Sequence, residues 1–100
     1  MRITETRIYE IALIELFYES RNNNEAKEKI EIILKVFKII SIFTGENHEE
    51  IICKLYFDRN NIVRAGIKLS ADKVFMQEKT LYSYRKKYCK IIKEIMVLFK

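Results

Sequence analysis

The sequence predicts an all-α fold, a compact bundle of about five helices. Proline is absent and glycine occurs only at Gly45 and Gly66, so few residues interrupt a helix. Apolar side chains recur three and four positions apart, which is the period of a helix that packs on one side. The chain is 49% hydrophobic and 33% charged over 100 residues, so we expect a single globular domain over residues 1–100.

The expected helices follow one another with short polar breaks. Their ranges are 4–19, 25–44, 48–58, 62–74 and 78–99. Thr4 and Asn24 are suitable N-caps for the first two helices, and Gly45 is a suitable stop for the second. Residues 47–50, with the sequence NHEE, resemble a capping box that has Asn in place of Ser or Thr.

The apolar periods also predict which sides of the helices face the core. The first helix has a broad apolar surface and should be buried on more than one side. In the fourth helix Gly66 marks a weak point or a close helix contact. The residues expected to point inward from that helix are Ile62, Val63, Leu69 and Val74. The last helix carries a heptad-like seam made of Leu81, Tyr84, Tyr88, Ile91, Ile95 and Leu98.

Positive charge is concentrated in the C-terminal half of the chain, whose overall net charge is +5. Residues 1–50 contain seven Lys or Arg against ten Asp or Glu, whereas residues 51–100 contain twelve against four. A lysine-rich coding bias would raise both halves, so it does not explain the difference. A basic region favours a polyanionic partner, most commonly nucleic acid. We therefore divide the domain into an acidic part, 1–45, for support or dimerisation, and a basic part, 46–100.

Residues 67–86 match the spacing that a helix-turn-helix requires. Where two helices cross closely, the first needs a small residue at the crossing, and Ala71 occupies that position. Apolar residues are needed at the end of the first helix, after the turn and on the inner side of the second. Here they are Val74, Met76, Leu81 and Tyr84. The spacing predicts a C-terminal helix-turn-helix whose second helix is the long last helix.

The same region resembles the helix-turn-helix of phage repressors, of sigma-70 region 4 and of sigma-like phage regulators of the ArpU and RinA kind. The strongest likeness is in residues 80–92, TLYSYRKKYCKII, which are similar to the threonine–apolar–x–x–aromatic–basic recognition helix of ArpU-like regulators. The likeness covers about forty residues of the C-terminal half. The chain departs from the pattern at the turn, where Phe75 replaces the usual glycine. A non-glycine residue in a left-handed conformation costs about 1–2 kcal/mol.

The resemblance implies that residues 78–87 lie in the major groove of DNA. The exposed side of the second helix would carry Gln77, Glu78, Lys79, Tyr82, Ser83 and Lys86. Gln77 suits adenine, and Lys79 or Lys86 suits guanine. Glu78 can accept a hydrogen bond from cytosine, while Tyr82 and Ser83 could touch bases or the sugar-phosphate backbone.

Phosphate contacts would flank this helix. Arg85, Lys87 and Lys90 are expected to neutralise phosphates and to fix orientation without reading sequence. Further phosphate candidates are Lys54, Arg59, Arg64 and Lys68.

Other kinds of site have little support in the sequence. The single histidine, His48, stands among glutamates without a second histidine, so we interpret it as an exposed residue at a helix start rather than a metal ligand. Cys53 and Cys89 have no CxxC spacing, which favours structural thiols in the reducing cytoplasm. No catalytic set, glycine-rich phosphate loop or long uncharged apolar run occurs. We expect no enzyme, cofactor, metal or membrane span.

Two functions from different classes remain open. The first is a DNA-binding transcriptional regulator, dimeric through residues 4–19 or the seam from Tyr88 to Leu98, and compatible with a contact to RNA polymerase. The second is a small helical adaptor that binds an acidic protein, such as part of the transcription machinery, through the same lysines. Association of residues 78–100 with a membrane surface is disfavoured, because the apolar side of that helix is needed to complete the core.

Overall fold

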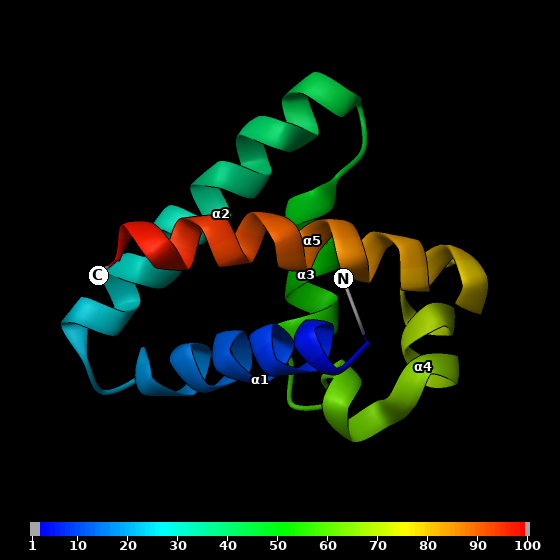
Figure 1. The fold of residues 1–100 in the computed structure, drawn as a ribbon, viewed down its shortest axis with the longest axis horizontal. Helices are drawn as coiled ribbons and strands as arrows, with labels where there is room; N and C mark the ends of the chain where they lie inside the picture. The colour runs from blue at the N-terminus through cyan, green and yellow to red at the C-terminus, as the bar shows by residue number, and fades with distance from the viewer. Residues whose placement is uncertain (1–2, 100) are drawn as a thin grey trace.

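The computed structural model describes the backbone of residues 3–99 and the side chains of residues 5–99 (Figure 1). This part of the chain forms five helices, each within two residues of its expected bounds, which confirms the all-α class. The helices are α1 (Ile3–Glu19), α2 (Asn24–Thr44), α3 (His48–Tyr56), α4 (Ile62–Lys73) and α5 (Glu78–Leu98). None of them, over the described residues, is long and apolar enough to cross a bilayer.

The helices form a compact globule in which α1 and α5 pack side by side and run in the same direction (Figure 1). α3 contacts α1, α2 and α4, and α4 also contacts the beginning of α5. α2 packs on α1 and α3. In Figure 1 the C-terminal end of α2 extends beyond the other helices, so part of its surface has no neighbour.

One core connects all five helices and uses the apolar seam of α5. Its fully or almost fully buried members include Leu13, Ile33, Phe37, Ile52, Leu55, Ile62, Ala71, Leu81, Tyr88 and Ile92. Because Tyr88 and Ile95 are buried within the chain, the seam of α5 is not a free surface for dimerisation. Only its end is open to solvent, at Leu98.

A buried ion pair joins α1 to α5. Arg85 donates from Nε and Nη2 to the two carboxylate oxygens of Glu10, at 2.9 and 2.6 Å. The Tyr56 hydroxyl on α3 donates to the same carboxylate at 2.7 Å. Glu10 has no exposed surface, although its position among the acidic residues of the N-terminal half suggests a solvated side chain. Three hydrogen bonds compensate the cost of burying its charge.

Asn23 and Gly45 cap the two ends of α2, close to the expected positions. Asn23 rather than Asn24 is the N-cap, because its Oδ1 accepts hydrogen bonds from the N–H groups of Glu25 and Ala26 at 2.9 and 3.2 Å. The helix ends at Gly45, whose φ of 77° lies in the left-handed region. That conformation favours glycine, which confirms Gly45 as the stop.

Asn47 caps α3 as the NHEE pattern predicts. Its Oδ1 accepts a hydrogen bond from the Glu50 N–H at 3.0 Å. The Glu50 carboxylate accepts from the Asn47 side-chain amide at 3.3 Å, so the reciprocal bond joins two side chains rather than returning to the backbone. The expected cap at Thr4 lies outside the residues whose side chains are described.

Gly66 divides α4 into two short helical pieces. Its φ of 84° and ψ of 173° are accessible almost only to glycine. A Cβ built at this position meets no atom within 4 Å, so the residue serves the backbone bend and not a close helix contact. The bend also changes the helical phase. As a result Leu69 does not share the inward side of Ile62, and it is exposed rather than buried as expected.

Candidate nucleic-acid interface

The connection between α4 and α5 is a tight turn with Phe75 in a left-handed conformation, at φ 57°. The Phe75 N–H donates to the Asp72 carbonyl at 3.2 Å, and the Met76 N–H donates to the Ala71 carbonyl at 2.9 Å. These two bonds form a Schellman motif, which ends a helix and redirects the chain. The Phe75 side chain is 89% exposed, and the ammonium of Lys54 lies 5.6 Å from its ring centroid.

The inner residues of the two helices pack together after this turn. Ala71, Val74 and Leu81 belong to one buried cluster, as the helix-turn-helix spacing predicts. Met76 and Tyr84 are half-buried against that cluster. Neighbouring Ser70 is buried as well, and its hydroxyl has no hydrogen-bond partner among the described residues.

The outer side of α5 is polar and open to solvent. Of the residues expected to contact DNA, those that are exposed are Gln77, Glu78, Lys79, Tyr82, Ser83, Lys86, Lys87 and Lys90. Gln77 precedes the first turn of α5, but its side chain makes no capping hydrogen bond. Its amide is therefore free to bind another group at the N-terminal end of the helix.

Arg85 is the exception, and its expected role as a phosphate contact is wrong. It follows Leu81 by four positions, which places it on the inner side of α5. Its guanidinium is buried and bound to Glu10. Burial lowers the pKa of this group, but the hydrogen bonds and charge of Glu10 outweigh burial and raise the pKa above its usual value. Arg85 thus holds the inner side of α5 against α1 through its ion pair with Glu10.

The exposed lysines form a basic stripe along α5, made of Lys79, Lys86, Lys90 and Lys93. These residues are three, four or seven positions apart, so they share one side of the helix. At about 1.5 Å per residue, the stripe is about 21 Å long. None of the four forms an ion pair with another described residue. Lys93 lies just beyond residues 80–92 and was not among the expected DNA contacts. Its spacing from Lys86 and Lys90, seven and three positions, could have identified it as a member of the stripe.

The other phosphate candidates differ in how free they are. Lys54 is paired with Glu50 at 3.1 Å, so part of its charge is already compensated. Arg59, Arg64 and Lys68 are exposed and make no ion pair within the described part of the chain.

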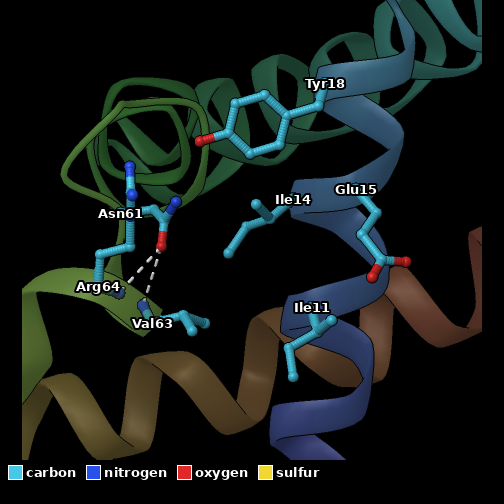
Figure 2. Close-up of a pocket in the computed structure, with 7 residues that line it drawn as sticks. All are labelled: Ile11, Ile14, Glu15, Tyr18, Asn61, Val63 and Arg64. Carbon is cyan, nitrogen blue, oxygen red and sulfur yellow. Dashed lines mark hydrogen bonds between the residues drawn. The ribbon is translucent and has the colours of Figure 1, made fainter.

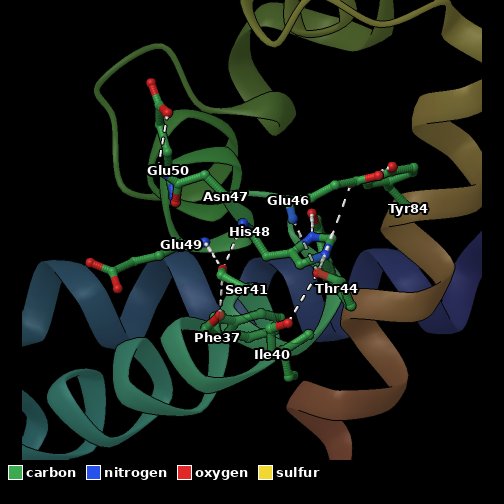
Figure 3. A network of polar contacts seen from close by, with 11 residues as sticks. Phe37, Ile40, Ser41, Thr44, Glu46, Asn47, His48, Glu49, Glu50 and Tyr84 are labelled. Carbon is green, nitrogen blue, oxygen red and sulfur yellow. Dashed lines mark hydrogen bonds and ion pairs between the residues drawn. The ribbon is translucent and has the colours of Figure 1, made fainter.

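A polar network holds α5 against the junction of α2 and α3 (Figure 3). His48 Nδ1 lies 2.8 Å from the Tyr88 hydroxyl, and its Nε2 lies 2.9 Å from the Thr44 hydroxyl. The Tyr84 hydroxyl donates to the Glu46 carboxylate at 2.6 Å. His48 is buried, which corrects the expectation of an exposed histidine at a helix start. Its ring instead bridges three helices, and this could not be inferred from its local sequence.

The two tyrosines of this network stay protonated at neutral pH. The pKa of Tyr88 is raised by burial first, and then by neighbouring Tyr84 and Glu46. The pKa of Tyr84 is raised mainly by its hydrogen bond to the Glu46 carboxylate. Both hydroxyls therefore remain uncharged partners on the inner side of α5, while exposed Tyr82 points away from them.

A cleft of about 510 Å³ lies elsewhere, between α1 and the start of α4 (Figure 2). Its lining residues are Ile11, Ile14, Glu15, Tyr18, Asn61, Val63 and Arg64. Asn61 caps α4 at the cleft, where its Oδ1 accepts from the N–H groups of Val63 and Arg64 at 3.1 and 3.2 Å. No residue of the basic stripe lines this cleft.

Comparison with family models, curated proteins and solved structures finds no significant match to this chain. Across the described residues, no three His, Cys, Asp or Glu side chains come together in a group that could hold a metal ion.

Proposed function

We propose that this protein is a DNA-binding transcriptional regulator of the helix-turn-helix type. The observation that carries the proposal is the division of α5 into two sides. Its inner side is held by Leu81, Arg85 and Tyr88, and its outer side presents unpaired lysines with Gln77 at the N-terminal end. A helix with its N-terminal end free and its outer side basic is suited to the major groove.

The residues of α5 would divide into base contacts and phosphate contacts. Gln77, Glu78, Lys79, Tyr82, Ser83 and Lys86 belong to the segment that would face base edges. Lys87, Lys90 and Lys93 lie further along the exposed surface and would neutralise phosphates.

Salt dependence of duplex binding tests this proposal directly. With about four phosphates neutralised, the logarithm of the binding constant should fall against log salt with a slope of about −3.6, at about −0.9 per phosphate. Fluorescence anisotropy with a mixed-sequence duplex measures this slope. The absence of binding to any duplex at roughly 50 mM salt would reject the proposal.

Charge reversal on the stripe supplies a matched comparison. Lys79→Glu and Lys86→Glu should each abolish or strongly weaken duplex binding, since each replaces an attraction to phosphate by a repulsion. Lys27→Glu on α2 changes the net charge equally at another exposed lysine and should have a much smaller effect. If the three variants bind duplex alike, the basic stripe is not the DNA contact. The alternative, an adaptor for an acidic protein, is then the better explanation of the lysines.

Sequence readout can be separated from phosphate binding within the same helix. Gln77→Ala should broaden the set of duplexes selected from a random pool, because it removes a donor and acceptor suited to adenine. Lys90→Ala should weaken all duplexes alike and reduce the salt slope by about 0.9. If the wild type and Gln77→Ala select the same sequences, Gln77 does not read a base.

A further inference from the structure

The outer side of α2 exposes an apolar stripe that the fold leaves uncovered. Its members, Ile32, Ile39, Ile42 and Phe43, are 46, 54, 74 and 85% exposed. They lie within about 100° of the helix circumference over three turns. Large apolar side chains clustered in this way mark interaction surfaces, because isolated exposed residues are ordinary but contiguous ones are costly.

Charged residues beside the stripe are sorted along the helix. Glu28 and Glu31 lie toward its N-terminal end, and Lys35 and Lys38 lie toward its C-terminal end. All four are exposed, and none forms an ion pair with another residue that the structure describes. Two such helices laid parallel would bring like charges together. Laid antiparallel with their midpoints near residue 35, they bring Glu31 against Lys38 and Ile32 against Ile39, while the two Lys35 side chains lie near each other at the midpoint.

We infer that the α2 stripe is the interface of a homodimer in which two α2 helices pack antiparallel about a two-fold axis near Lys35. Ile32 lies against Ile39 of the second copy, and Glu31 lies against Lys38 of the second copy. Each contact occurs twice, as a two-fold interface requires. This surface replaces the expected dimerisation surface on α5, whose seam is buried. On α1, Leu13 and Ile14 are buried, but Ile8, Ile11 and Tyr18 remain exposed.

The inference does not depend on DNA binding and is tested without DNA. Sedimentation equilibrium should give twice the 12.1 kDa mass of one chain. Ile32→Asp combined with Ile39→Asp should weaken association at least about a hundredfold, because it places charges in the apolar contact between Ile32 and Ile39 of the second copy. Leu69→Asp combined with Leu98→Asp is the control: it places the same charge at two exposed apolar residues outside α2 and should remain dimeric. Far-UV circular dichroism verifies that each variant is folded.

A charge exchange tests the pairing itself. Lys38→Glu alone should weaken the dimer about tenfold, because it sets two repulsive pairs in place of two attractive ones. Adding Glu31→Lys in the same chain should restore association, since the pairs are then reversed but complementary. Failure of the double variant to recover would overturn the Glu31–Lys38 pairing.

Cross-linking determines the direction of the helices. Chains carrying Ile32→Cys, mixed with chains carrying Ile39→Cys, should join predominantly as mixed pairs through a short bismaleimide, with Cys53 replaced by Ser in both. In an antiparallel dimer the identical positions are separated by about seven residues, or about 10 Å along the axis. The inference would be overturned if cross-links formed predominantly between identical positions. It would also be overturned if the wild type sedimented as a single chain at the highest soluble concentration.

Discussion

The buried pair of Arg85 and Glu10 makes the sharpest prediction about stability. The Glu10 carboxylate accepts two hydrogen bonds from Arg85 and one from Tyr56, at 2.6 to 2.9 Å, and has no exposed surface. Arg85→Met removes two of these bonds and leaves a buried carboxylate with one neutral donor. Removing one member of a buried ion pair costs about 3–5 kcal/mol.

That loss is large relative to the whole stability of a small domain, about 5–15 kcal/mol. Urea unfolding followed by circular dichroism at 222 nm measures it as a fall in the free energy of unfolding. Replacing all three polar groups, as Glu10→Leu, Tyr56→Phe and Arg85→Met, removes the buried charge altogether. This triple variant should be substantially more stable than Arg85→Met alone, because no unpaired polar group remains in the core.

If Arg85→Met changes the free energy of unfolding by less than about 1 kcal/mol, as a surface substitution does, the guanidinium is not buried against Glu10. A loss of duplex binding with unchanged stability would return Arg85 to the group of phosphate contacts. The prediction therefore distinguishes a residue that positions α5 from one that touches DNA.

Three further predictions concern backbone strain, a buried hydroxyl and pH. Gly66→Ala should destabilise by about 1–3 kcal/mol, because its φ of 84° and ψ of 173° are accessible almost only to glycine. Phe75→Gly should stabilise by about 1–2 kcal/mol, because it relieves a non-glycine residue of a left-handed conformation; equal urea midpoints for the two variants would contradict this. Ser70→Ala should stabilise by about 1–2 kcal/mol by removing an unpartnered buried hydroxyl; a loss in thermal unfolding would reveal a hidden partner. Burial raises the pKa of the Cys89 thiol to about 12, so the folded chain keeps a proton that the unfolded chain releases above about pH 8.5. The contribution of this thiol to the free energy of unfolding should be fully present below that pH and should be lost as the pH rises toward 12. In Cys89→Ala the fall should be less steep. Urea midpoints at several pH values measure both.

The helices themselves could be predicted because helix formation is governed by local patterns. The period of apolar residues and the caps at Gly45 and Asn47 place every helix within two residues of its position. The helix-turn-helix spacing also predicts that Ala71 and Leu81 are buried, and both are. The spacing identifies Phe75 as the residue in the usual place of the turn glycine, but only the structure shows that it adopts the left-handed conformation.

Partners distant in the chain could not be predicted in this way. Nothing local distinguishes buried Glu10 from the other glutamates of the N-terminal half, because its partner Arg85 is 75 positions away. His48 similarly depends on Tyr88, 40 positions away. In each case the local sequence suggests a solvated polar residue, and the packing of helices decides otherwise.

The sequence by itself determined the helical class, the places where helices begin and end, and the segregation of positive charge, because each depends on neighbours within a few positions. Tertiary structure alone decided which polar side chains are compensated in the core and which remain free in solvent. The physical reason is that burial of a charge requires a specific partner from another helix. The same packing left Ile39 and Phe43 uncovered on α2 and directed Arg85 inward while its neighbour Lys86 faces outward.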